Sequence, residues 1–216
     1  MIDSDSPTAL VWFKRDLRVR DHAPLAAAQR FERTLALVAI EPAWLASPEC
    51  SPQQVVWYLQ SVQSLRTELA ARGLPLLVQV GDMLQLLQAL QQQHGITHLF
   101  SHEETGAGWS YSRDLAVARW CTHSGVQWQE WAQTGVVRRL RTRQGWAGRW
   151  ALRMNAPEAP AARAFKAVPG LALGDLPAVP ALHDLGLAQP PQPLPAAGEK
   201  AAWTVLHGFV GGRGRD

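Results

Sequence analysis

The sequence predicts an α/β fold: a Rossmann-like, doubly wound sheet of five parallel strands with helices on both faces, followed by a long connector rich in proline and alanine. Three observations support this prediction. Residues 9–13 and 34–40 are continuous apolar runs, as expected for strands buried on both faces of a parallel sheet. Such runs alternate with segments of helical period as far as residue 131. From about residue 155 the periodicity stops, and proline and alanine dominate.

Each element of the alternation has its own local signal. Asp21 and Asp82 are the expected N-caps of the first and third helices, while Gly73 and Gly95 follow the ends of the second and third. Right-handed crossovers then place the helices on both faces of the sheet. The strands are expected at residues 9–13, 34–40, 74–80, 97–102 and 126–131, and the helices at 22–31, 51–73, 83–95 and 109–125.

The length of 216 residues suffices for one α/β domain with a tail. We expect an α/β domain at 1–134, a basic segment and connector at 135–200, and the start of a new helical unit at 201–216. The two cysteines have neither a disulfide nor a metal-ligand spacing. The N-terminus lacks the basic and apolar runs of a signal peptide, and no apolar stretch reaches membrane-spanning length. These features predict a cytoplasmic protein without a membrane partner.

Positive charge is concentrated in one segment, although the formal net charge is only +3. Phosphate contacts alone give affinity without specificity, so we predict weak, salt-sensitive and sequence-blind DNA binding there. A solvated loop, or a surface that docks another domain, is the simpler alternative. The predicted DNA-binding residues are Arg138, Arg139, Arg141 and Arg143, with Arg149 and Arg153 following closely.

Ligands of doubly wound sheets bind at the carboxyl ends of the strands, near the point where the strand order reverses. Neither a G-x-G-x-x-G sequence nor a Walker sequence occurs, which disfavours dinucleotide and P-loop binding. Lys14 and Arg15 follow the first strand and could form a cationic wall, although Arg15 and Asp16 could equally form a salt-bridged turn.

The fourth strand is followed by a second group of polar residues. Glu103 and Glu104 could accept a hydrogen bond from a flat heterocycle on which Trp109 stacks, or they could cap the next helix. We place a ligand pocket between the first and fourth strand ends, with Ile40 and Leu45 as its apolar floor.

Other chemistry has little support in the sequence. His98 and His102 have no partner at metal-ligand spacing, so we predict no metal site. No nucleophile elbow or catalytic triad can be nominated, so no catalytic residue is assigned. Ten tryptophans are unusually many for this length, and core packing accounts for most of them, including Trp12, Trp57 and Trp120.

The segment LVWFKRDLRVRDHAPLAAA closely resembles the opening signature of the DNA photolyase and cryptochrome family, in which W-F-[RK]-x-D-L-R follows the first strand. The segments GLPLLVQVGD and THLFSHEE, and the pair Arg113-Asp114, extend the resemblance over essentially the whole chain. The residues that match the signature are Trp12, Phe13, Lys14, Asp16, Leu17, Arg18 and Asp21.

This resemblance implies the N-terminal light-harvesting domain of a light-driven DNA photolyase that acts on pyrimidine photoproducts. It implies an antenna pigment here, either a deazaflavin, FMN or a folate. FAD and damaged DNA would be bound by a C-terminal helical domain, of which residues 201–216 resemble the truncated start, so the fragment should be inert in repair. By the same resemblance Lys14, Arg15 and Glu103 contact the pigment, whereas a second family acid falls on Thr105.

Two alternatives stay open from the sequence. A cryptochrome would use the same domain in blue-light signalling through partner contacts. A free-standing nucleotide-binding-like module would share the strand and helix alternation, but it would not need the WFKRDLR sequence.

Overall fold

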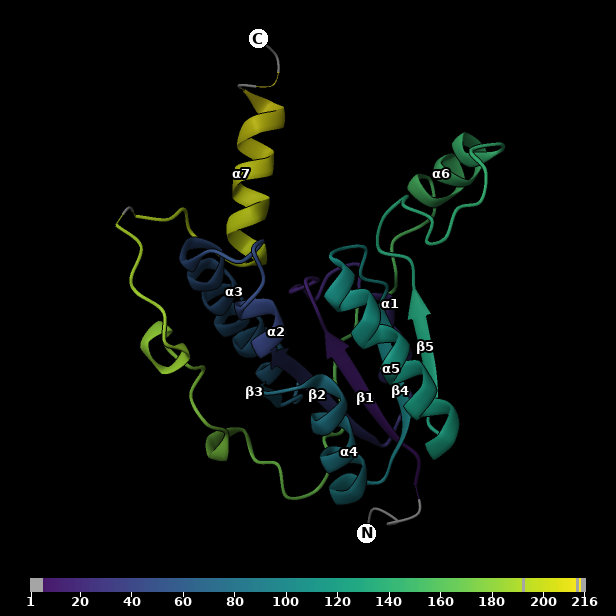
Figure 1. The fold of residues 1–216 in the computed structure, drawn as a ribbon, viewed down its shortest axis with the longest axis vertical. Coiled ribbons are helices and arrows are strands. Elements are labelled where there is room, and N and C mark those ends of the chain that lie inside the picture. The colour runs from purple at the N-terminus through teal and green to yellow at the C-terminus, as the bar shows by residue number, and fades with distance from the viewer. Residues whose placement is uncertain (1–5, 192, 213, 215–216) are drawn as a thin grey trace.

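The computed structural model describes residues 6–191, 193–212 and 214 (Figure 1). Strands and helices alternate as predicted through the first five strands, and most boundaries differ from the expected ones by one to three residues. The strands are β1 (Thr8–Phe13), β2 (Arg33–Ile40), β3 (Leu76–Val80), β4 (Ile96–His102) and β5 (Gln127–Trp131). The helices among them are α1 (Ala23–Ala28), α2 (Pro42–Leu45), α3 (Pro52–Ala70), α4 (Met83–His94) and α5 (Gly108–Ser124).

The sheet is all-parallel with the order β3-β2-β1-β4-β5, which confirms the predicted Rossmann-like architecture. The chain builds outward from β1 to β3 and then returns to the other side of β1 to form β4. The strand order therefore reverses between β1 and β4. This is the point at which ligands of such sheets bind.

Alternate residues of β1 enter two separate cores because successive side chains of a strand point to opposite faces. Val11 and Phe13 pack with α1 and α3 on one face, whereas Leu10 and Trp12 pack with α4 and α5 on the other. All six residues of β1 are buried. The central strand is thus covered on both faces, and the charged side chains that follow it lie at its carboxyl end.

Helix starts follow side-chain chemistry, with one difference from prediction. Ser51 forms a capping box with Gln54 at α3, and Asp82 caps α4 as expected. The N-cap of α1 is His22 rather than Asp21, because the ring Nδ1 of His22 accepts the hydrogen bond from the backbone N–H of Leu25. The imidazole therefore takes the role that we predicted for a carboxylate.

The connector wraps around the body of the protein, as Figure 1 shows for the green segment between α6 and α7. Ala167 of the connector forms an isolated parallel β-bridge with Thr34, near the start of β2. Phe165, Val168 and Leu182 from this segment are buried in the two cores. The connector contains two short 3₁₀ helices, Leu173–Asp175 and Leu182–Leu185.

Two helices stand out from the body. The helix α6 (Trp146–Met154) lies within the arginine-rich segment, where we expected no helix, and buries none of its residues. The helix α7 (Glu199–Gly211) follows the connector, close to the expected position at 201–212. Figure 1 shows α6 and α7 on the same side of the molecule as the carboxyl ends of the strands.

Candidate functional site

An ion-pair network occupies the carboxyl ends of β1 and β4. Its centre is Arg113 of α5, whose guanidinium lies 2.5 Å from Glu41 Oε2, 2.5 Å from Glu104 Oε2 and 2.9 Å from Asp114 Oδ1. Burial alone would lower the pKa of Arg113, but the carboxylates of Glu41, Asp114 and Glu104 outweigh it and raise the pKa. The same guanidinium covers the ring face of Trp12.

Lys14 extends the network towards β5. Its Nζ lies 3.2 Å from Asp114 Oδ2 and 3.2 Å from Glu130 Oε1, and 4.2 Å from the ring centre of Trp12. Arg138 bonds to the same two carboxylates. Burial raises the pKa of Glu130, although Lys14 and Arg138 oppose that shift. The side chain of Lys14 is almost fully buried, and its ammonium group is paired with carboxylates inside the protein.

This network leaves little open space at the β1/β4 switch point. The cavity there measures about 20 Å³, room for about one water molecule. Trp109 lines it, and the buried indole N–H of Trp109 has no hydrogen-bond partner in the described structure. The crevice is therefore narrower than we expected, because Arg113 and its carboxylates fill it.

Arg15 lies at the junction of three hollows. It lines the small cavity, a polar hollow of about 260 Å³ beside Glu104 and Gln133, and a groove of about 600 Å³. Its Nε lies 3.1 Å from Glu104 Oε1, and its guanidinium lies 5.2 Å from the ring centre of Trp44. Arg15 pairs with Glu104 rather than with Asp16, which corrects the salt-bridged turn considered from the sequence.

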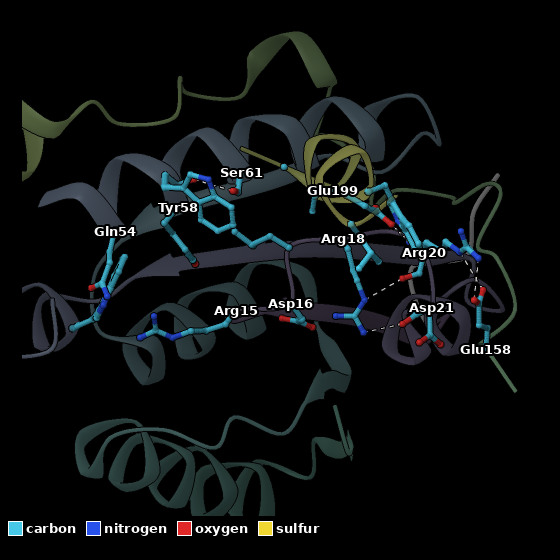
Figure 2. A pocket seen from close by; sticks show the side chains of 17 residues that line it. Arg15, Asp16, Arg18, Arg20, Asp21, Gln54, Tyr58, Ser61, Glu158 and Glu199 are labelled. Carbon is cyan, nitrogen blue, oxygen red and sulfur yellow. Dashed lines mark hydrogen bonds and ion pairs between the residues drawn. The ribbon is translucent and has the colours of Figure 1, made fainter. Parts of the chain in front are cut away.

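The groove is the largest of these spaces, and Figure 2 shows its lining. Its walls come from distant parts of the chain: the loop after β1, Trp44 of α2, the exposed side of α3, Glu158 of the connector, and the first turns of α7. One end is aromatic, and the other carries charged side chains. Its residues are Arg15, Asp16, Leu17, Arg18, Arg20, Asp21, Trp44, Gln54, Trp57, Tyr58, Ser61, Glu158, Gly198, Glu199, Ala202, Trp203 and Leu206.

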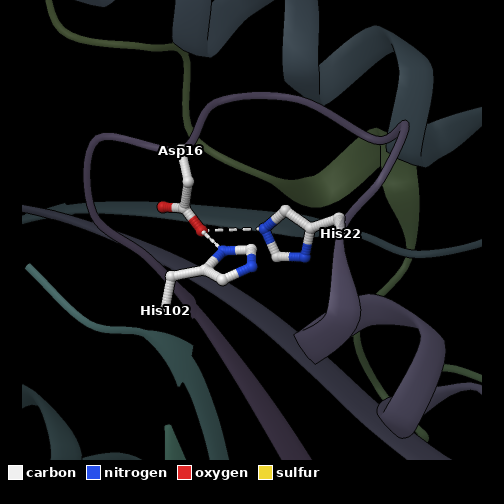
Figure 3. A group of neighbouring side chains, drawn as sticks. All are labelled: Asp16, His22 and His102. Atoms are coloured by element: carbon white, nitrogen blue, oxygen red, sulfur yellow. Dashed lines mark hydrogen bonds and ion pairs between the residues drawn. The ribbon is translucent and has the colours of Figure 1, made fainter. Parts of the chain in front are cut away.

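Asp16 holds the loop after β1 through two histidines (Figure 3). Its Oδ2 lies 2.8 Å from His22 Nε2 and 2.6 Å from His102 Nδ1, and its Oδ1 accepts from the backbone N–H of Lys14. Burial alone would raise the pKa of Asp16, but the hydrogen bonds from His102 and His22 outweigh it and hold the pKa well below its usual value.

This triad brings together three potential metal ligands that the sequence spacing does not reveal. The Asp16 carboxylate already accepts three hydrogen bonds, and His22 Nδ1 accepts from Leu25. Because these atoms already have hydrogen-bond partners, we assign the triad a structural role, joining β1, the start of α1 and the end of β4.

The predicted pigment contacts lie in different environments. Glu103 is half-buried, its backbone N–H donates to the Trp131 carbonyl, and it lines none of the three hollows. Glu104 is the acid that enters the network, and neither carboxylate caps α5. Ile40 is fully buried in the core, and Leu45 is half-buried against the same core.

The predicted DNA-binding arginines are divided between two roles. Arg138 is held by Glu130, Asp114 and the carbonyl of Glu104, and Arg139 Nε donates to the hydroxyl of Tyr111. Arg141 and Arg143 are exposed in the loop that leads into α6. The segment 132–157 contains no aspartate or glutamate, so its surface charge has a single sign.

The tryptophans separate into core and surface positions. Trp12 is buried as predicted, whereas Trp57 is 42% exposed and lines the groove. Trp146 and Trp150 lie near each other, with ring centres 6.5 Å apart. Sequence reasoning missed Trp44 and Trp203, whose indoles lie beneath the guanidinium groups of Arg15 and Arg20. These contacts depend on tertiary structure and have no signal in local spacing.

The fold and the charged loop after β1 agree with comparisons to known proteins. The profile of the DNA photolyase family matches residues 9–147. The deoxyribodipyrimidine photo-lyase of Salmonella typhimurium is 39% identical over 100 residues, which are 44% of this chain and 21% of that protein. An uncharacterized 31.6 kDa protein of Synechococcus is 27% identical over 217 residues, covering 94% of this chain and 75% of that protein.

A solved structure extends the similarity of fold. A bacterial class III photolyase from Agrobacterium tumefaciens superposes with a TM-score of 0.74 at 21% identity, over 96% of this chain and 45% of that one. The site and sheet define a Rossmann-like α/β domain with a charged switch point. The chain belongs to the DNA photolyase family, as its N-terminal, photolyase/cryptochrome-type domain.

The match spans less than half the length of these photolyases. Within the residues that the structure describes, no helix is both long and apolar enough to cross a membrane.

Proposed function

We propose that this chain is the light-harvesting domain of a light-driven, FAD-dependent DNA photolyase acting on pyrimidine photoproducts, and that it binds a flat antenna pigment at the carboxyl edge of its sheet. The observation that carries the proposal is the convergence of three hollows on Arg15, within the family match. A bound deazaflavin, FMN or folate would absorb light and pass its excitation onward.

The electrostatics of this edge support the proposal. Arg15 is half exposed and shares Glu104 with Arg113, so its guanidinium can still face a planar ligand. Arg15 and Trp44 would hold such a pigment by stacking and hydrogen bonding, while Lys14 would act through the network behind it. Contact by Glu103 remains a prediction. In this proposal FAD, the lesion and the electron-transfer chemistry belong to a helical domain outside this chain.

Pigment binding by the purified chain tests this function. FMN, a deazaflavin and a folate are titrated separately into the wild-type chain and into Arg15→Ala, and binding is followed by pigment fluorescence. We expect one pigment to bind and Arg15→Ala to weaken it about tenfold or more, as loss of a stacked, charge-assisted contact does. Arg163→Ala, an exposed arginine outside these hollows, is the control. Failure of all three pigments to bind contradicts the proposal.

DNA binding by this chain would be secondary. The exposed Arg141 and Arg143 support weak phosphate contacts, whereas Arg138 and Arg139 are engaged with the body. Lesion repair is not expected from this chain alone, and illumination of dimer-containing DNA with it should leave the dimers intact. Signalling as a cryptochrome would use the same pigment site and would differ in residues outside this chain.

One comparison favours a second candidate, a free-standing pigment-binding module. The match covers 75% of the Synechococcus protein, so only a quarter of that protein lies outside the matched region. The nucleotide sequence downstream of the codon for Asp216 decides between the candidates. A continuing helical domain supports the photolyase or cryptochrome, and a stop codon supports the module.

A further inference from the structure

We propose that the groove bounded by α3 and α7, and not the β1/β4 crevice, seats the ring of a flat conjugated heterocycle, with Trp57 and Trp203 as its walls. This inference deepens the proposed pigment-binding function and rests on it. It assigns a ligand role to α7, which follows the connector and lies outside the residues that match the family profile.

Volume is the first reason for choosing the groove. Pockets for cofactor-sized ligands measure about 300–1,000 Å³. The groove holds about 600 Å³, whereas the crevice holds about 20 Å³. To widen the crevice, Arg113 would have to leave Glu41, Glu104 or Asp114. Glu104 and Asp114 have further cationic partners in Arg15, Lys14 and Arg138, but the described ion pairs give the buried carboxylate of Glu41 no cation except Arg113. A tricyclic ring therefore fits the groove without disturbing the network.

The chemistry of the walls is the second reason. Trp44 and Tyr58 form an edge-to-face pair at one end, with ring centres 4.9 Å apart and planes at 62°. Trp57, one residue before Tyr58 on α3, is 42% exposed and lines the same groove. Exposed indoles offer flat apolar faces on which a conjugated ring stacks. Arg15 supplies a guanidinium over Trp44, which can also stack on a planar ligand.

The opposite wall is held firmly enough to act as part of a site. Glu199, in the first turn of α7, accepts hydrogen bonds from the backbone N–H groups of Val19 and Arg20. Arg20 lies over Trp203 with its guanidinium 4.5 Å from the ring centre, and it pairs with Glu158 on the connector. Figure 2 shows Glu199, Arg20 and Glu158 near one another at the charged end of the groove. The indole of Trp203 is thereby fixed facing the loop after β1.

The carboxylates of the groove already have partners, which leaves its aromatic end to select the ligand. Asp16 binds two histidines, Asp21 accepts from the backbone N–H of Ala159, and Glu158 pairs with Arg20. Arg18 donates to the carbonyls of Arg20 and Asp21 (Figure 2). A neutral ring system is therefore the part of a ligand that the groove recognises.

FMN is the probe, because stacking on indole quenches its ring fluorescence. It is titrated into the wild-type chain and into Trp57→Ala, Trp203→Ala, Trp203→Phe and Trp109→Ala. We expect Trp57→Ala and Trp203→Ala each to weaken binding about tenfold or more, as loss of one stacked ring does. Trp203→Phe should restore much of the affinity, and Trp109→Ala in the crevice should leave it unchanged. Trp146→Ala is the matched control, since Trp146 is 39% exposed on α6.

Circular dichroism melting of each variant shows whether α7 and the sheet remain folded. Loss of FMN binding in Trp109→Ala with retention in Trp203→Ala and Trp57→Ala would overturn the groove assignment while leaving the pigment-binding function standing. If FMN fails to bind the wild-type chain, while a folate or deazaflavin binds it and the two groove variants bind that pigment equally well, the assignment also fails. If no pigment binds, the proposed function fails with it.

Discussion

Asp16 shows how one buried carboxylate can connect three elements. It has two imidazole partners and a backbone donor, and its side chain is almost completely buried. We expect Asp16→Asn to lower the free energy of unfolding by about 3–5 kcal/mol, because the change leaves buried donors without their charged acceptor. Urea unfolding of the variant measures this decrease. A change below about 1 kcal/mol would show that the triad contributes little to stability.

A second residue-scale prediction concerns pH. Burial lowers the pKa of His22, with the Asp16 contact opposing and His102 and Arg18 adding to the decrease. The unfolded chain then binds more protons than the folded one as pH falls through about 6.5, the usual histidine value, so stability decreases on acidification. The lowered pKa of Asp16 acts in the same direction below about pH 4.

We therefore expect the melting temperature to fall between about pH 7.5 and 5.5, and the fall to be smaller in His22→Asn. Asparagine keeps a side-chain oxygen that can cap α1 but does not titrate. Partial burial also lowers the pKa values of His94 and His98, so part of the slope should persist in the variant. An unchanged slope in His22→Asn would remove His22 from the explanation.

At the scale of the element, α7 depends on one glycine for its attachment. Gly198 has a φ of +92°, and a Cβ there would lie 2.5 Å from Ser64 Oγ on α3. Gly198→Ala should therefore free the first turn of α7, loosening the contacts of Glu199 and the ion pair of Lys200 with Glu68.

Hydrogen exchange measures this effect directly. Amides of α7 should lose protection in Gly198→Ala while those of β1 and β4 keep it, because the sheet does not depend on α7. Gly174→Ala, at a connector glycine with open space around its Cβ, is the matched control. Equal protection of α7 in both variants would contradict the role of Gly198.

An element can be predicted from the sequence when neighbouring residues alone determine it. The five strands are predictable because apolar runs such as 34–40 report burial directly. The helix α6 is not predictable in this way, because none of its residues is buried. The spacing of its apolar residues therefore does not indicate a face that packs on the core. The exposed position of Trp57 also escapes prediction, since α3 turns that side of the helix towards the loop after β1 and α7 rather than into the core.

The site is less predictable than the fold for the same reason. The sequence places Lys14 and Arg15 correctly at the end of β1, because a strand end is a local feature. The exchange of partners that joins Arg15 to Glu104 and Asp16 to His102 depends on how β4 and α5 dock beside β1. Spacing along the chain contains no information about that docking.

For the molecule as a whole, the purely positive side-chain charge of residues 132–157 leads to a prediction about DNA. Binding to undamaged DNA should be weak and should decrease with salt. Replacing both Arg141 and Arg143 with glutamine should reduce the slope of log affinity against log salt by about 0.9 for each phosphate that these side chains neutralise. Arg163→Gln should not change it. Salt-resistant binding that prefers damaged DNA would contradict this prediction.

Arg138→Gln should behave differently from that double variant. Arg138 connects Glu130, Asp114 and the Glu104 carbonyl, so its removal should destabilise the chain while leaving the salt slope of DNA binding nearly unchanged. Thermal melting alongside a salt titration separates the two effects.

The construction of the groove from distant parts of the chain also affects biosynthesis. All five strands have emerged from the ribosome once Trp131 is outside, whereas Trp203 follows only after the whole connector has been translated. Domains begin to fold during synthesis, so a nascent chain arrested within the connector should already resist proteolysis across the sheet. Ligand capture should begin only when α7 is released, well after the sheet has folded.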